Sequence, residues 1–148
     1  LKEKREITNK IKIFKKSSYL AGENKSLVLN KDQIDVNIKN KSFELIDARS
    51  RERFLGLQPE ARKELKSGNT KDSKNMPFTE LINSNDRTFK KKDELISIFE
   101  KNKINPNKKI AFSCGSGVTA TVVGLANSII SGKKPVVYDG SWAEYGIK

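Results

Sequence analysis

One strand, loop and helix in the second half of the chain constrains the fold most. The apolar run Lys109–Ser113 predicts a buried strand, and Cys114 stands directly after it. Gly115 and Gly117 then allow a tight turn, and Val118–Ser131 has the apolar spacing of a helix. A strand that runs through a glycine-containing turn into a helix is typical of α/β domains with a parallel sheet.

The flanking segments extend this pattern. Phe43–Asp47 predicts a second buried strand and Pro135–Tyr138 a third, followed by a turn at Asp139–Trp142. Asp93–Lys103 predicts another helix, with acidic residues in its first turn. The alternation predicts an α/β fold with a parallel central sheet flanked by helices. The residues expected to share a helix face are Leu95, Ile98 and Phe99 in one helix and Val122, Leu125, Ala126 and Ile129 in the other.

Three other segments are less regular. Asp32–Asn40 alternates apolar and polar residues like a strand, but its start also fits a short helix. Arg51–Asn75 is long and polar, and such a stretch is usually functional or contains short helices. Residues 1–25 are lysine-rich and predict a connector or an arm lying on a surface, which leaves residues 26–148 as the folded domain.

The composition excludes several kinds of site. The 148 residues include no histidine and one cysteine, so a His-based triad, a His metal site and an internal disulfide cannot form within them. We expect no metal and no cofactor. No segment approaches the roughly 20 apolar residues of a membrane span, and a lone cysteine suits a reducing compartment, so we expect a cytoplasmic protein without a membrane partner. Because the chain begins at Leu1, we expect a piece of a longer polypeptide.

The net charge of +12 is compatible with a nucleic-acid partner. The lysines, however, are spread along the chain, and few aromatic residues accompany them to stack on bases. We therefore expect no nucleic-acid partner. A lysine-rich surface also attracts small anionic substrates.

Cys114 is the candidate nucleophile. At the carboxyl end of a strand, it stands where open α/β sheets bind ligands. The two glycines let the loop amides point inward as an anion-binding nest, and the following helix adds positive charge at its start. Both effects favour thiolate over thiol and would also stabilise a persulfide. The alternative is that Cys114 is a small buried apolar residue without chemistry.

The loop Cys114–Thr119 resembles the active-site loop of rhodanese-type sulfurtransferases, and more narrowly that of the 3-mercaptopyruvate sulfurtransferases, which has the pattern C-G-[ST]-G-V-T. Further matching segments occur in the family's order and spacing. They are Asp47-Ala48-Arg49-Ser50, Arg53-Phe54, Pro59-Glu60-Ala61-Arg62, Asn75-Met76-Pro77-Phe78-Thr79 and Tyr138-Asp139-Gly140-Ser141-Trp142. The resemblance covers about residues 27–142.

The resemblance implies a rhodanese-like fold and a position in a longer protein. In the family, two such domains occur in tandem, and the second carries the cysteine. Residues 26–148 would then be the catalytic C-terminal domain, and residues 1–25 would connect it to an N-terminal rhodanese-like domain that helps to wall the site. The resemblance implies a small-molecule sulfur donor and a thiol (or cyanide) acceptor, with thioredoxin as a candidate acceptor.

The resemblance also implies the donor. Thiosulfate-using relatives have basic residues directly after the cysteine, whereas Gly115 and Ser116 are neutral. The arginines that hold the carboxylate and keto oxygen of 3-mercaptopyruvate match Arg53 and Arg62 here. A planar guanidinium suits a carboxylate better than a lysine does. The alternative for each arginine is a solvated surface charge.

The remaining site residues follow from the same motif. Gly117 and Val118 complete the substrate-binding loop. The hydroxyls of Ser116 and Thr119 are candidates to relay a proton, although Thr119 is equally suited to cap the helix. Asp47, at a strand end, would orient Arg53 or the loop, or serve the structure alone.

One segment departs from the family's pattern. The family's Gly-His-Ile-Pro-Gly is replaced here by Gly68-Asn69-Thr70-Lys71-Asp72, which predicts a differently shaped loop.

The sequence also bears on several rival functions. A phosphatase of related fold would need the pattern Cys-x5-Arg, but Ala120 stands where that arginine belongs. A thiosulfate sulfurtransferase, a noncatalytic rhodanese-like binding module and a basic nucleic-acid-binding protein each fit part of the sequence.

Overall fold

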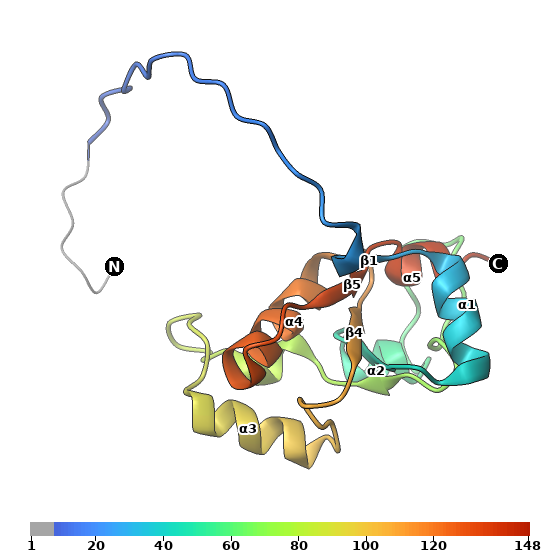
Figure 1. The fold of residues 1–148 in the computed structure, drawn as a ribbon. Coiled ribbons are helices and arrows are strands. Elements are labelled where there is room, and N and C mark those ends of the chain that lie inside the picture. Colours follow the sequence, from blue (N-terminus) through green and yellow to red (C-terminus); the bar gives the residue numbers. More distant parts are fainter. Residues whose placement is uncertain (1–7) are drawn as a thin grey trace.

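The computed structural model describes residues 8–148. Within them, five parallel strands form one sheet in the order β1-β5-β4-β2-β3 (Figure 1). The strands are β1 (Val28–Leu29), β2 (Glu44–Asp47), β3 (Lys74–Asn75), β4 (Ile110–Ser113) and β5 (Val136–Tyr138). The helices are α1 (Lys31–Asn40), α2 (Arg51–Phe54), α3 (Lys92–Lys101), α4 (Val118–Ser131) and α5 (Ser141–Tyr145), with short 3₁₀ turns η1 (Lys25–Leu27) and η2 (Phe78–Leu81). The predicted fold class is confirmed.

Each face of the sheet packs against its own apolar core. Alternate residues of a strand point to opposite faces, so Ile46 and Phe112 enter one core while their neighbours Leu45 and Ala111 enter the other. The first core includes residues of α3 and α4, and the second includes Ile34 of α1. Helices therefore cover both faces, as the strand–helix alternation predicts.

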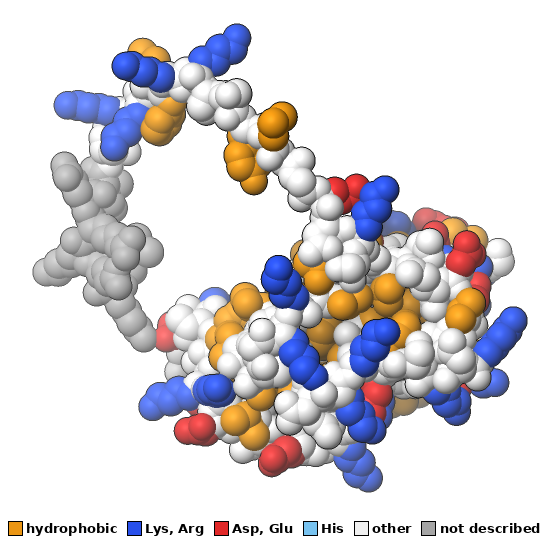
Figure 2. Space-filling view, viewed as in Figure 1, with side chains coloured by type: hydrophobic (Ala, Val, Ile, Leu, Met, Phe, Trp, Pro, Cys, Tyr) orange, Lys and Arg blue, Asp and Glu red, His pale blue; other side chains and the backbone are white. Residues whose placement is uncertain are grey.

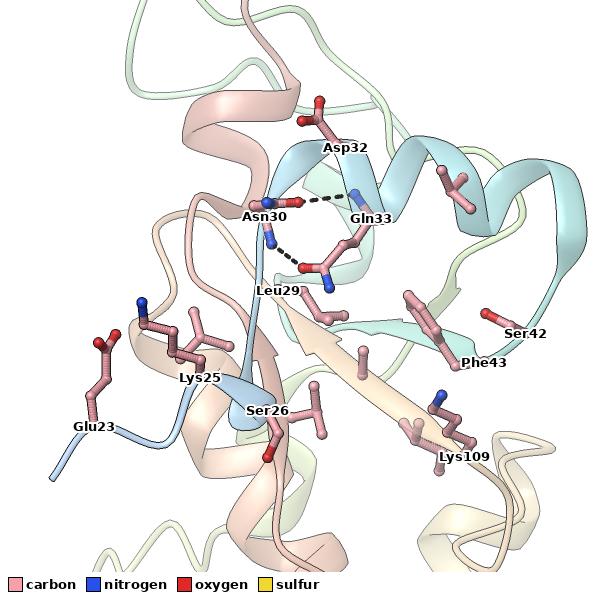
Figure 3. Close-up of a pocket in the computed structure, with 15 residues that line it drawn as sticks. Glu23, Lys25, Ser26, Leu29, Asn30, Asp32, Gln33, Ser42, Phe43 and Lys109 are labelled. Carbon is pink, nitrogen blue, oxygen red and sulfur yellow. Dashed lines mark hydrogen bonds between the residues drawn. The ribbon is translucent and has the colours of Figure 1, made fainter.

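The segment 32–40, which fitted either a strand or a helix, is helical. Asn30 caps α1: its side chain accepts a hydrogen bond from the Gln33 N–H at 3.0 Å, and the Gln33 side chain accepts one from the Asn30 N–H at 3.0 Å (Figure 3). This reciprocal capping box satisfies two N–H groups that a helix start would otherwise leave unpaired.

The prediction of which α4 residues are buried is partly wrong. Val123, Gly124 and Asn127 are buried together with the expected Ala126, whereas Leu125 and Ile129 are 49% and 39% exposed. At Gly124 the helix approaches its neighbours too closely for a side chain: a Cβ atom there would lie 2.7 Å from Cβ of Pro135. In α3, the expected Leu95 and Phe99 are fully buried, and Ile98 packs against them.

The arm does not lie on this domain in the part described from residue 8 onward. Residues 8–24 contain no helix or strand and extend away from the sheet (Figure 1). Their large apolar side chains are all exposed, Ile13 and Leu20 to 97% and 96%. The rest of the predicted arm falls outside the described residues.

Lysine and arginine side chains are spread over the face in Figure 2 and do not gather in one patch.

The long polar stretch from 51 to 75 contains the short helix α2 and ends in the edge strand β3. Within its altered segment, Asp72 has a φ of 62°, at the position where the resemblance expects glycine. Aspartate tolerates this left-handed conformation better than most residues, so the backbone can still turn there.

None of the helices in residues 8–148 combines the length and apolar character that crossing a membrane requires.

Candidate active site at the cysteine loop

Cys114 lies between the end of β4 and the start of α4, at the carboxyl ends of the parallel strands, as the sequence predicts. Its side chain is 1% exposed. Gly117 precedes α4 with a φ of 82°, and a Cβ atom there would lie 2.9 Å from the carbonyl oxygen of Asp139. The loop therefore needs glycine at this position, for both its conformation and its close contact.

The hydroxyl of Ser141 organises the cysteine loop. Its Oγ accepts hydrogen bonds from the backbone N–H groups of Cys114 at 3.0 Å and Gly117 at 3.1 Å. It also donates to the carbonyl oxygen of Tyr138 at 2.8 Å. Two of the amides expected in the anion-binding nest thus bind Ser141 instead, so any such nest consists of the remaining loop amides.

The sequence predicts a turn at Ser141 and no role for its side chain. The turn follows β5, which pairs with β4 in parallel, so its start meets the cysteine loop at the same sheet edge. Two backbone hydrogen bonds complete the attachment: the N–H of Trp142 donates to the Cys114 carbonyl at 3.0 Å, and the N–H of Ala143 donates to the Gly115 carbonyl at 2.8 Å. The loop conformation therefore depends on α5 as well as on its own glycines.

We expect Ser141→Ala to destabilise the domain by about 1–3 kcal/mol, because two buried N–H groups and one carbonyl lose their partner. Urea unfolding would measure this loss, and the midpoint should fall without a change in slope. Ser67→Ala is the matched control, because Ser67 is exposed. Equal stability of the two variants would show that Ser141 does not hold the loop.

The cysteine loop and both predicted arginines line one cavity of about 210 Å³. Arg53 lies on α2, and Arg62 lies in the segment that follows it. The other lining residues are Glu60, Ala61, Leu65, Cys114, Gly115, Ser116, Val118 and Thr119. Tertiary structure thus brings together every predicted site residue except Asp47 and Gly117, although their chemical roles remain predictions.

The loop side chains differ in access. Ser116 is exposed and Val118 is 69% exposed, whereas Thr119 is half-buried. Thr119 does not cap α4: the cap position belongs to Gly117, and no side chain caps the helix start. The capping alternative for Thr119 was therefore wrong, because this residue already lies inside the first turn of the helix.

Arg53 lies directly beside the cysteine loop. A Cβ atom on Gly115 would stand 3.1 Å from Nη2 of Arg53. The same Nη2 donates a short hydrogen bond to the carboxylate of Glu60. The side chain of Arg53 is 33% exposed and lines the cavity. Because Gly115 has no side chain, there is free space next to this guanidinium.

Asp47 pairs with Arg49 and makes no direct hydrogen bond or ion pair with Arg53. Its carboxylate accepts hydrogen bonds from Nη2 of Arg49 at 2.7 Å and from Nε at 2.9 Å, and both side chains are buried. Arg49 also donates to Glu60 at 2.7 Å and to the carbonyl of Gly68 at 2.9 Å, and it stacks 4.6 Å from the Trp142 ring centroid. The contact with Arg53 thus comes from Glu60, for which the sequence predicts no role of its own.

Glu60 is charged in this setting. Burial raises the pKa of its carboxyl group, but hydrogen bonds and charges from Arg53 and Arg49 outweigh burial and hold the pKa below the usual 4.5.

Among residues 8–148, no group of three or more Cys, Asp or Glu side chains is placed to hold a metal ion.

A larger groove of about 820 Å³ lies elsewhere, beside the amino ends of β4 and β5 (Figure 3). It is bordered by β1 and the start of α1, and Leu29 and Phe43 contribute apolar surface to it. Cys114 is not among its lining residues, so the groove is separate from the site described above.

Comparison with known proteins agrees with this geometry. Residues 30–148 match the rhodanese-like domain model. The chain belongs to the rhodanese-like domain family. It is 41% identical over 119 residues to thiosulfate/3-mercaptopyruvate sulfurtransferase 2 of Arabidopsis thaliana, covering 80% of this chain and 34% of that protein. It is 34% identical over 146 residues to thiosulfate sulfurtransferase of Bos taurus, covering 98% of this chain and 49% of that protein.

A solved structure has a similar architecture. The Tum1 protein of Saccharomyces cerevisiae superposes with a TM-score of 0.73 at 26% identity, covering 81% of this chain and 43% of that one. The chain thus spans less than half the length of each of these relatives. Their names include both thiosulfate and 3-mercaptopyruvate, so similarity alone does not select a sulfur donor.

Proposed function

We propose that this rhodanese-like domain is a sulfurtransferase that moves sulfur from 3-mercaptopyruvate to a thiol through a persulfide on Cys114. The observation that carries the proposal is the cavity in which Cys114 and two arginines meet, with Arg53 bordering a side-chain-free position at Gly115. A thiolate in such a loop supplies the nucleophile, and the arginines supply planar donors for a carboxylate.

The reaction has two steps. In the first, the Cys114 thiolate attacks the donor sulfur, the carbon–sulfur bond breaks, and its electron pair leaves as the enolate of pyruvate, which then takes up a proton. Arg53 and Arg62 would hold the donor carboxylate and stabilise the oxygen on which negative charge develops. Ser116 and Thr119 line the cavity and are the proposed proton relay.

In the second step, an acceptor thiolate attacks the outer sulfur of the persulfide. The sulfur–sulfur bond breaks, the acceptor leaves as a persulfide, and the Cys114 thiolate is regenerated. A small thiol or thioredoxin is the proposed acceptor. We also propose that an N-terminal rhodanese-like domain of the same polypeptide helps to close the cavity.

Thiosulfate is the second candidate donor, because relatives of both names match and the positive charge of Arg62 in the cavity also attracts a dianion. The two donors separate in a side-by-side rate measurement on the complete polypeptide. We expect kcat/KM for 3-mercaptopyruvate to exceed that for thiosulfate by roughly tenfold or more, equivalent to about 1.4 kcal/mol of transition-state preference. A higher value for thiosulfate would reverse the choice of donor. No transfer from either would favour a noncatalytic binding module.

A further inference from the structure

Glu60 places a buried negative charge in a cavity that is proposed to bind an anion. Its side chain is 2% exposed, and its two oxygens bind different arginines: Oε1 accepts from Nη1 of Arg49 at 2.7 Å, and Oε2 accepts a short hydrogen bond from Nη2 of Arg53. A carboxylate here would repel an anionic donor unless the two guanidinium groups compensated it.

The Arg49 end of this arrangement is held on several sides. Arg49 is 1% exposed, and its guanidinium contacts Asp47, the carbonyl of Gly68 and the ring of Trp142. Because Arg49 is fixed in this way, it also fixes Oε1 of Glu60, and the planar carboxylate then directs Oε2 at Arg53. Nη2 of Arg53 is thereby held next to Gly115.

Three ion pairs link four charged side chains in a row: Asp47, Arg49, Glu60 and Arg53. Their charges alternate in sign, so the two negative and two positive groups sum to zero. Arg53 therefore offers directed N–H donors while these four groups add little net charge to the cavity, whose other charged lining residue is Arg62. A single carboxylate gains from directed donors, whereas the dianion thiosulfate gains more from net positive charge.

We propose that Glu60 is a positioning residue that determines donor specificity: it fixes Arg53 for carboxylate recognition and cancels the charge that would attract thiosulfate. This inference rests on the proposed function. Two substitutions of Glu60 test it: one removes the charge and keeps the length of the side chain, and the other keeps the charge and shortens the side chain.

The test is Glu60→Gln in the complete polypeptide, with kcat/KM measured for both donors. Glutamine keeps the size of the side chain but loses the charge and one acceptor. We expect kcat/KM for 3-mercaptopyruvate to fall about tenfold, and kcat/KM for thiosulfate to rise roughly three- to tenfold. Added salt should reduce the thiosulfate gain, because screening weakens a charge effect.

Two further variants separate orientation from charge. Glu60→Asp keeps the charge but is too short to bridge both arginines, so 3-mercaptopyruvate use should fall while thiosulfate use stays within about twofold. It also serves as the test if Glu60→Gln does not fold. Glu100→Gln removes the same charge from an exposed position on α3 and should change neither donor.

Parallel losses for both donors in Glu60→Gln and Glu60→Asp would overturn the inference, because a merely structural role predicts them. Unchanged kinetics in both variants would overturn it as well. If the unmodified protein fails to use 3-mercaptopyruvate, the proposed function fails separately. The thiosulfate gain in Glu60→Gln then still decides the charge effect.

Discussion

Replacing Cys114 with serine should reduce sulfur transfer from 3-mercaptopyruvate by roughly a thousandfold or more, since the proposed nucleophile is lost and the loop offers no second thiol. Serine is close in size to cysteine and should fit the buried position. The loss should therefore be chemical, and urea unfolding should show a domain of nearly unchanged stability.

Mass spectrometry gives a second readout for this variant. After incubation with donor and no acceptor, the peptide that contains Cys114 should gain the mass of one sulfur atom, and the Cys114→Ser peptide should not. An acceptor thiol should then remove the added sulfur. Transfer that survives in Cys114→Ser would show that another group carries the sulfur, and the assignment to this loop would fail.

Replacing Arg53 with alanine should lower kcat/KM for 3-mercaptopyruvate by about 10- to 100-fold, the effect of losing a charge-assisted hydrogen bond worth about 1.5–3 kcal/mol. Arg62→Ala should act in the same direction with less structural disturbance, because Arg62 is exposed. Thiosulfate use should fall less in both variants, because thiosulfate loses the attraction of one positive charge but has no carboxylate contact to lose.

Arg51→Ala is the matched control for Arg53→Ala. Arg51 lies on the same short helix, but its guanidinium pairs with Glu80 at 2.9 Å and does not line the cavity. Its removal should leave both donors unaffected. Equal losses for the two donors in Arg53→Ala would argue against a carboxylate clamp and favour a general electrostatic role.

Much of the fold can be predicted because its signals are local. The bounds predicted for α4, Val118–Ser131, are those observed, and Gly132 closes the helix with a φ of 73°. The edge strands β1 and β3 were not predicted. Each has two residues, too few to show the alternation on which strand prediction depends.

The buried face of α4 shows a different limit. Hydropathy ranks Leu125 and Ile129 above Gly124, yet Gly124 is buried and both larger residues are partly exposed. Which small residue allows close packing depends on the partner across the interface, here Pro135 and Phe112. A periodicity count contains no information about that partner.

For the site, the sequence by itself determined the cysteine, its two glycines and their place between a strand and a helix, because these depend on neighbours along the chain. Only the tertiary structure decided what holds them. Ser141 binds Cys114 from 27 residues further along the chain. Glu60 links Arg53 to Arg49, and it lies 11 residues from Arg49 in the sequence. Hydrogen bonds and ion pairs of this kind act over about 3 Å, so they appear only when folding brings the strand ends together.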